Sequence, residues 1–260
     1  MIRNLTVFTS PLGGAGKSTL VSGAACAFAL RGETAAVLDL NPVVGDLETI
    51  LEAEPASPYH LGDAAEERCS LQEAIFPAGG KAPEGVFLGL SPRRREELPK
   101  GEMLRQWLFY LSRKYDRVLL DLPWWAPCLE QAMLHAAHTL VICSPERRAV
   151  SACERLRQSL FGQLPNEPRL LLNRFHRKQF WETGAFEDLD QVIDRCGLRL
   201  IGVVPEDPEL QRSVPGAMAQ TKDYRQQPFR QKGLAGAVAL HCAAARLAGE
   251  TVPLRELDRL

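Results

Sequence analysis

A glycine-rich segment near the amino terminus constrains this chain more than any other feature. The segment reads Ser10-Pro11-Leu12-Gly13-Gly14-Ala15-Gly16-Lys17-Ser18-Thr19; it follows an apolar run and precedes an alanine-rich stretch. Glycines between a strand and a helix let backbone N–H groups approach an anion, and the helix dipole adds to the attraction. The segment therefore predicts a phosphate-binding loop, with Lys17 on phosphate and Ser18 on Mg²⁺. The general pattern has glycine at Pro11, so the match is one residue short; the alternative is a glycine-rich turn that happens to precede Lys-Ser.

Hydrophobic patterning around this loop alternates between strand-like and helix-like stretches. The predicted strands are Leu5–Thr9, Ala35–Asp39, Val86–Leu90, Arg117–Asp121, Thr139–Cys143, Arg169–Leu172 and Leu200–Val204. The predicted helices are Lys17–Leu30, Leu47–Leu51, Leu71–Phe76, Met103–Lys114, Glu130–Ala137, Ala149–Leu160, Leu189–Cys196 and Leu234–Ala248. Several strands are apolar on both faces, as in a parallel sheet covered by helices. With no linker or internal repeat, residues 1–260 predict a single α/β domain, a doubly wound, mostly parallel sheet with helices on both faces.

Composition excludes several classes of protein. The 31 Lys and Arg residues balance 32 Asp and Glu residues, so we expect no nucleic-acid partner. No apolar run reaches the roughly 18–20 residues of a membrane span, and no signal peptide is evident, so we expect a cytoplasmic protein. The seven cysteines are scattered and include no CxxC pair. We expect reduced, mostly buried thiols and, because the five histidines lack ligand spacing, no dedicated zinc site.

Polar residues close four of the predicted strands. They are Asp39, Asp121, Asn173 with Arg174, and the segment Pro205-Glu206-Asp207. Ligands of doubly wound sheets bind at the carboxyl ends of strands, so these positions are candidate site residues. Asp121, after four apolar residues, suits a Walker B role in which it reaches Mg²⁺ through water. Each residue has the alternative role of a helix cap or turn former.

Together these segments resemble the MinD/ParA family of P-loop ATPases, in particular its MinD branch with the flagellar- and pilus-positioning relatives. The resemblance spans essentially the whole chain, through GGAGKST, LDLNPVVGDLETIL, ERCSLQEAIF, KYDRVLLDLP, TLVICSPERRAV, LLLNR and IGVVPEDPELQRSV in family order. It implies binding of ATP and Mg²⁺, a face-to-face homodimer and docking on membrane or protein partners. Gly13, Gly14, Ala15, Gly16, Lys17, Ser18 and Thr19 would then cradle phosphates and metal, Asp121 would be the Walker B acid, and Asn173, Arg174 and Pro205 would lie at the adenine.

Two departures from the family pattern bear on catalysis. The family has a signature lysine, which reaches the partner's phosphates across the dimer, where this chain has Leu12. The family's second-strand motif has two aspartates, of which Asp39 is present and the water-orienting one is Asn41. Losing such a cation can slow phosphoryl transfer about a thousandfold or more, and Asn cannot act as a base. We therefore predict a degenerate catalytic site of Lys17, Asp39 and Asn41 that binds nucleotide and hydrolyses it weakly or not at all.

The replacement of the signature lysine is open. Arg147 or Arg148 could supply the missing charge, and the alternative is that both are solvated on a helix face. We expect Lys17→Ala to abolish nucleotide binding with little loss of stability, because an exposed loop lysine contributes little to packing.

Other segments are candidate partner surfaces. Trp124 and Trp125 follow Asp121 and could anchor a partner or dimer interface, or pack under the next helix. The basic and aromatic segment Phe175–Trp181 could bind a partner or form a mobile loop with buried rings. Arg93-Arg94-Arg95 precedes two glutamates and is expected to be a solvated turn.

The carboxyl-terminal segment GETVPLRELDRL bears on membrane binding. Its charges cancel, and Pro253 limits any helix to about two turns, too short to be stable alone. We therefore expect no autonomous membrane anchor and, at most, recruitment to the membrane periphery by partners.

These observations favour a MinD/ParA-like ATP-binding switch that helps to position or assemble an envelope or division machine. One alternative is a competent slow ATPase of the same family. A second is a metal-cluster carrier of the superfamily, which needs paired cysteines at a dimer axis, and no suitable pair is visible. A third is a small-molecule ligase or kinase resembling dethiobiotin synthetase.

Overall fold

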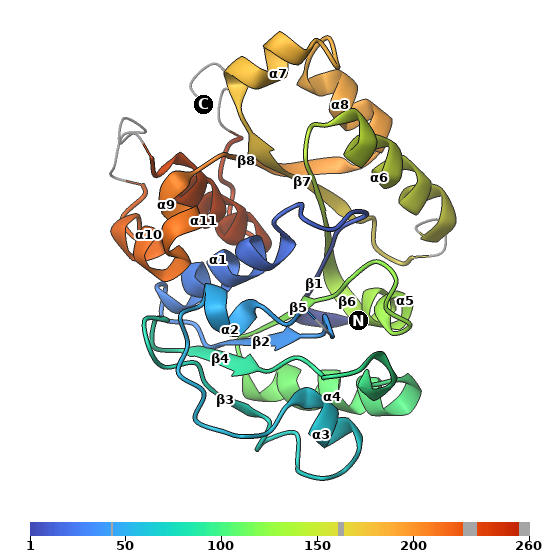
Figure 1. Ribbon diagram of the computed structural model, residues 1–260, viewed down its shortest axis with the longest axis vertical. Coiled ribbons are helices and arrows are strands. Elements are labelled where there is room, and N and C mark those ends of the chain that lie inside the picture. Colours follow the sequence, from blue (N-terminus) through green and yellow to red (C-terminus); the bar gives the residue numbers. More distant parts are fainter. Residues whose placement is uncertain (43, 161–163, 226–232, 255–260) are drawn as a thin grey trace.

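A central eight-stranded sheet organises the protein, as the computed structural model in Figure 1 shows for residues 1–42, 44–160, 164–225 and 233–254. The strand order is β3-β4-β2-β5-β1-β6-β7-β8. The strands are β1 (Ile2–Thr9), β2 (Ala35–Asp39), β3 (Ile75–Pro77), β4 (Val86–Gly89), β5 (Arg117–Asp121), β6 (Ala136–Cys143), β7 (Arg169–Phe175) and β8 (Arg199–Pro205).

The pairing of the strands fixes where a ligand can bind. Every neighbouring pair is parallel except β3 with β4, which is antiparallel. Strand β1 lies between β5 and β6, and the chain crosses from one side of β1 to the other between these two strands. This is a topological switch point, where a crevice opens at the carboxyl ends of the strands.

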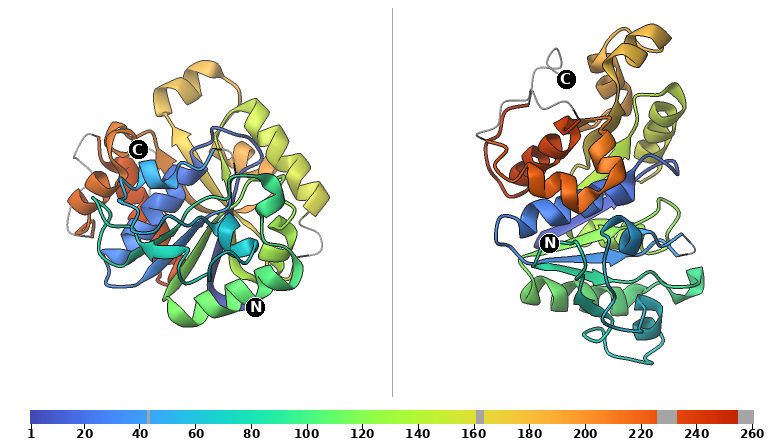
Figure 2. Two further views of the ribbon diagram at one scale, coloured as in Figure 1. Left: turned by 60° about the horizontal axis from the view of Figure 1, so that its bottom comes forward. Right: turned by 60° about the vertical axis from the view of Figure 1, so that its left-hand side comes forward.

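Helices cover both faces of the sheet (Figures 1 and 2). On one face α1 packs against α10 and α11, and on the other lie α4, α5, α6 and α8. The helices are α1 (Lys17–Ala29), α2 (Leu47–Ile50), α3 (Leu61–Ala65), α4 (Gly101–Lys114), α5 (Leu129–His135), α6 (Arg147–Leu160), α7 (Arg177–Thr183), α8 (Leu189–Cys196), α9 (Pro208–Arg212), α10 (Val214–Gln220) and α11 (Ala235–Leu247), with a 3-10 turn at Arg95–Glu97. The expected doubly wound, mostly parallel architecture is confirmed.

Alternation along the strands divides the apolar core in two. In β1, Leu5 and Val7 pack in the core under α4 to α6, whereas Phe8 packs in the core under α1 and α11. In β5, Leu120 joins the first core and Leu119 the second. Successive side chains of a strand point to opposite faces, so a strand buried on both faces needs an unbroken apolar run.

Two sequence predictions about elements are wrong, and one alternative is only partly right. Leu71–Phe76 was predicted as a helix, but residues 71–74 form a turn and residues 75–77 form β3, because Phe76 pairs with Leu88 of the neighbouring strand. The predicted helix Glu130–Ala137 ends at His135, and β6 begins at Ala136. The segment Phe175–Trp181, for which a loop with buried rings was one alternative, contains the start of α7; Phe175 and Phe180 are buried, whereas Trp181 is exposed.

The prediction that the carboxyl-terminal segment forms no membrane anchor concerns residues that are only partly described. Residues 255–260, the last half of the segment GETVPLRELDRL, lie outside the described residues. None of the helices in the described ranges combines the length and the apolar character needed to cross a bilayer.

Candidate functional site

The glycine-rich loop connects β1 to α1 at the switch point of the sheet. Gly14 and Gly16 have φ angles of 79° and 82°, in the left-handed region that favours glycine. Gly13 and Gly14 are exposed, and Gly16 precedes the first residue of α1. The loop thus presents unobstructed backbone at the positive end of a 13-residue helix, which is the geometry of an anion site.

Asn173 braces this loop from the end of β7. Its side-chain Nδ2 donates a hydrogen bond of 2.8 Å to the carbonyl of Ala15. A β-carbon on Gly16 would lie 2.3 Å from the same nitrogen, so glycine is required there by contact as well as by φ. Asn173 was expected at the adenine; in the structure its amide acts on the backbone of the loop.

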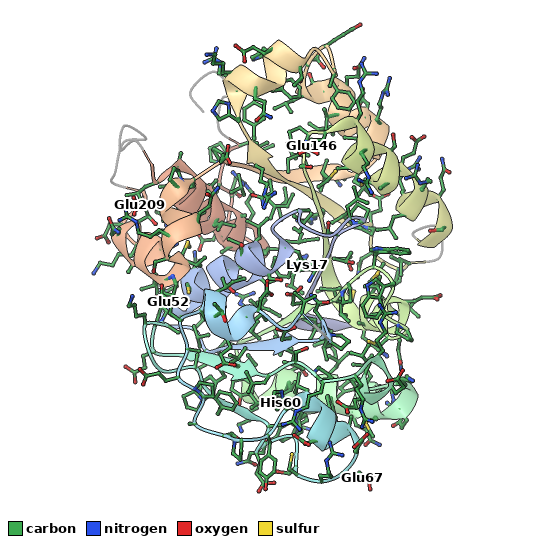
Figure 3. The ribbon with its side chains drawn as sticks, in the orientation of Figure 1. Lys17, Glu52, His60, Glu67, Glu146 and Glu209 are labelled. Carbon is green, nitrogen blue, oxygen red and sulfur yellow. The ribbon has the colours of Figure 1, made fainter. Side chains whose placement is uncertain are left out.

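Lys17 is held by the predicted Walker B residue. Figure 3 shows Lys17 near the middle of the molecule, where the loop leads into α1. Its ammonium forms an ion pair with the carboxylate of Asp121, and the two side chains are 11% and 0% exposed. The expectation of an exposed loop lysine is therefore wrong, because the end of β5 lies directly under the loop. Desolvation by burial lowers the pKa of Lys17 to about 8, and the carboxylates of Asp39 and Asp46 oppose that shift.

Asp39 has a structural task besides any catalytic one. Its carboxylate accepts hydrogen bonds from the backbone N–H of Asn41 at 3.0 Å and of Leu47 at 3.3 Å, so it ties together both ends of the segment before α2. Desolvation by burial raises the pKa of Asp39 to about 6, although these two bonds lower it. Asn41 lies half-buried beside it, and its carbonyl accepts a hydrogen bond from the Ser91 hydroxyl.

Asp46 is a site residue that the sequence analysis missed. It precedes α2, and its carboxylate acts electrostatically on both Lys17 and Asp39. Its Oδ1 atom is buried and has no hydrogen-bond partner among the residues that the structure describes. The available signal was an acidic residue immediately before a short helix in the segment after β2. Three carboxylates therefore surround Lys17.

The residues expected to bind Mg²⁺ fit a hard cation. Ser18 lies half-buried in the first turn of α1, and Asp121 ends the adjacent strand β5. Hydroxyl and carboxylate oxygens are the donors that Mg²⁺ prefers, usually with several waters retained. Thr19 follows in the same turn and, with Gly16, lines the neighbouring cavity.

The side chain of Leu12 packs inward, whereas the family's signature lysine is expected to reach towards a facing subunit. Its partly buried side chain packs against the apolar core, and its carbonyl accepts a hydrogen bond of 2.9 Å from the Ser10 hydroxyl. Pro11 is buried. The start of the loop is thus held by apolar packing, and Leu12 offers no charge.

A cavity of about 270 Å³ extends from the loop towards the ends of β7 and β8. Gly16, Thr19, Asn173, Arg174 and Pro205 contribute to its lining, so the residues expected at the adenine are brought to one place. Arg174 is exposed and has a φ angle of 56°, which is uncommon for a residue other than glycine. Asp207 instead caps α9, accepting hydrogen bonds from the backbone of Glu209 and Leu210.

The two tryptophans after Asp121 have different environments. Trp124 is 49% exposed, whereas Trp125 packs against the core with the Arg95 guanidinium 4.2 Å from its ring centre. Arg147 and Arg148 begin α6 and are both exposed, as the alternative of a solvated face describes. Arg94 pairs with Glu97, in keeping with a solvated turn.

Comparisons with known proteins agree on one family. Residues 6–217 match the family described as "CobQ/CobB/MinD/ParA nucleotide binding domain". The septum site-determining protein MinD of Bacillus subtilis is 25% identical over 97% of this chain and 91% of its own length.

Solved structures share the fold. The MinC:MinD cell division protein complex of Aquifex aeolicus contains a chain with a TM-score of 0.74 and 22% identity, covering 97% of this chain and 99% of that one. The septum site-determining protein MinD of Pyrococcus horikoshii, complexed with Mg-ADP, has a TM-score of 0.72 and 20% identity, covering 94% and 95%.

Proposed function

The chain belongs to the family of CobQ/CobB/MinD/ParA nucleotide-binding domains, and from this premise we propose that it is an ATP-binding switch with weak or absent hydrolysis. ATP and Mg²⁺ are the ligands, bound in the cytoplasm. The protein helps to position or assemble an envelope or cell-division machine through protein partners, which can recruit it to the membrane periphery. The observation that carries the proposal is the left-handed glycine loop at the end of β1, with Lys17 held against Asp121.

The residues present define how nucleotide would be held. Backbone N–H groups of Gly13 to Gly16 would bind the phosphates, Lys17 would supply the charge, and Ser18 with Asp121 would hold the metal, Asp121 through water. The Asp121 carboxylate would have to bind both the Lys17 ammonium and a water of the metal. We therefore expect the ion pair between Lys17 and Asp121 to weaken when nucleotide binds. The cavity beside Asn173, Arg174 and Pro205 accepts the base.

Weak hydrolysis follows from two residues. Leu12 packs its side chain against the core, and it carries no charge with which to stabilise a phosphoryl group in a facing subunit. Asn41 offers an amide where a carboxylate would orient the attacking water. The partner-facing surface includes the exposed Trp124, which follows the Walker B strand by three residues.

A competent slow ATPase is the second candidate. Arg147 and Arg148 are exposed at the start of α6, which follows β6, and β6 is a direct neighbour of β1 in the sheet. An arginine there could act on a second subunit in place of the signature lysine.

The test compares wild type with Leu12→Lys, Asn41→Asp and the double variant. Single-turnover phosphate release and light scattering are measured after calorimetry has confirmed that each variant binds ATP. We expect wild type to bind without appreciable turnover or dimerisation, and the double variant to gain one or both. The single variants should gain less, because residues of one catalytic unit are non-additive.

Two outcomes contradict this function. Wild-type turnover equal to that of the double variant would favour the competent ATPase, and Arg147→Ala and Arg148→Ala would then identify the replacement. Wild-type protein that binds no ATP would remove the switch altogether and would direct attention to Pro11, whose fixed φ constrains the loop.

A further inference from the structure

Three cysteines far apart in the sequence converge in the core on the far side of the sheet from α1. Cys143 is the last residue of β6, Cys153 lies in α6, and Cys196 is the last residue of α8. Each is 0% exposed, and their Sγ atoms all lie within 4.8 Å of one another. The helices α6 and α8 pack side by side over this end of the sheet (Figure 1).

The spacing of the sulfurs suits a shared metal ion. Thiolates bind zinc at about 2.3 Å, so three of them around one ion lie about 4 Å apart. All three cysteines are free thiols and not a disulfide. The sulfurs therefore need only small movements to reach ligand distance, and side chains, not backbone, can supply them.

The surroundings give the thiols few other partners. Val150, Leu156, Val192 and Leu198 belong to the same apolar cluster. Cys143 donates a hydrogen bond of 3.2 Å to the carbonyl of Ser144, and otherwise the thiols face one another.

A cationic side chain with one unpartnered nitrogen, that of Arg157, flanks the cluster. Arg157 lies one turn beyond Cys153 on α6. Its Nε is buried and has no acceptor in the described part of the chain. A β-carbon on Gly197, the residue after Cys196, would lie 2.7 Å from that Nε, so the guanidinium packs against the backbone at the cluster.

We propose that Cys143, Cys153 and Cys196 bind one thiophilic metal ion of the Zn²⁺ or Cu⁺ class in the core between β6, α6 and α8. Each thiol that becomes a ligand releases one proton, and the remaining negative charge faces Arg157. Soft thiolate ligands select such ions over Mg²⁺, so this site is chemically separate from the glycine-rich loop. Among the described His, Cys, Asp and Glu residues, no fourth ligand joins these three.

The test titrates the full-length, phosphine-reduced protein with Cd²⁺, Zn²⁺ and Cu⁺ in separate arms. Ultraviolet sulfur-to-metal charge transfer reports Cd²⁺, and competition with chromophoric chelators reports the other two. We expect one equivalent per chain in at least one arm, with a higher melting temperature for the loaded protein. X-ray absorption of the bound ion should show three sulfur neighbours.

Variants decide whether these thiols are responsible. Cys153→Ala and Cys196→Ala should lose the bound equivalent, whereas Cys242→Ala, at a buried cysteine in α11, and Cys69→Ser, at a partly exposed one, should keep it. Arg157→Gln leaves all three sulfurs in place, so it should weaken the affinity without changing the stoichiometry. Failure of all three ions to bind, or equal binding by Cys153→Ala and Cys196→Ala proteins that circular dichroism shows to be folded, would overturn the proposal.

Discussion

The side-chain amide of Asn173 donates a hydrogen bond to the carbonyl of Ala15 across 158 positions of sequence. This bond joins the end of β7 to the centre of the phosphate loop. The same amide fills the space beside Gly16 in the loop. Asn173 also lines the cavity towards β8, so it contacts both the loop and the cavity. Asn173 therefore sets the shape of the loop before any ligand is contacted.

Removing that amide should loosen the loop. In Asn173→Ala the carbonyl of Ala15 loses its donor, and we expect stability to fall by about 1–2 kcal/mol and ATP affinity by about tenfold. Asn173→Asp is the matched control for size, since it keeps the shape but removes the donor, and it should be at least as damaging. Calorimetry and chemical denaturation measure both quantities. Unchanged affinity in both variants would show that the loop holds its shape without Asn173.

Lys17→Ala should abolish nucleotide binding and also destabilise the protein. The substitution leaves the fully buried Asp121 carboxylate without its ion-pair partner, and breaking a buried pair costs about 3–5 kcal/mol. The double variant Lys17→Ala with Asp121→Asn removes the orphaned charge and should recover much of that stability but no binding. Denaturant unfolding of the two variants provides the comparison, and equal stability of Lys17→Ala and wild type would contradict the buried pair.

ATP binding should take up a proton and weaken at alkaline pH. Burial lowers the pKa of Lys17 to about 8, and phosphate contact favours the charged form, which raises that pKa again. Affinity should therefore be constant below about pH 8 and should decline as pH rises from there towards the ordinary value of 10.5. Calorimetry in two buffers of different ionisation enthalpy counts the protons. If the heat of binding near pH 8.5–9, between the two pKa values of Lys17, does not depend on the buffer, then Lys17 does not take up a proton on binding.

Asp39→Asn should stabilise the protein at neutral pH. Burial raises the pKa of Asp39 from 3.8 to about 6, so the folded state bears a cost whenever this carboxylate is charged. The gain should be about 1–3 kcal/mol above pH 6, decrease as pH falls from 6 to 3.8, and vanish below it. The amide oxygen can still accept one of the two backbone hydrogen bonds, but the amide nitrogen is a donor and cannot accept the other, which takes away part of the gain. Urea unfolding at several pH values tests this, and a pH-independent difference would point to packing instead.

The two tryptophans should separate into a structural and a surface residue. Trp125→Ala loses core packing and the Arg95 contact and should cost about 1–2 kcal/mol, whereas the half-exposed Trp124 should cost less than about 0.5 kcal/mol. Trp181→Ala, at an exposed tryptophan of α7, is the control. If the loop senses ATP, the fluorescence change should persist in Trp181→Ala and diminish in Trp124→Ala. Equal stability losses at positions 124 and 125 would contradict this division.

Elements with a local cause could be predicted from the pattern of residues alone. Arg117–Asp121 and Leu189–Cys196 have the predicted bounds, because an unbroken apolar run and an amphipathic period each identify their element without distant partners. The glycine-rich loop could be found for the same reason, since left-handed glycines, lysine and hydroxyl all lie within one short segment.

Contacts between residues far apart in the chain could not be predicted in this way, because they depend on how whole elements pack. The strand at Ile75–Pro77 exists because β4 offers an edge, and its sequence alone resembled a helix. The burial of Lys17 depends on β5 lying under the loop, and the brace on Ala15 depends on where β7 ends. The three sulfurs of Cys143, Cys153 and Cys196 gather because a β-strand and two helices pack at one point. Periodicity reports the face on which a side chain lies, whereas its neighbours across that face are set by the packing of whole elements.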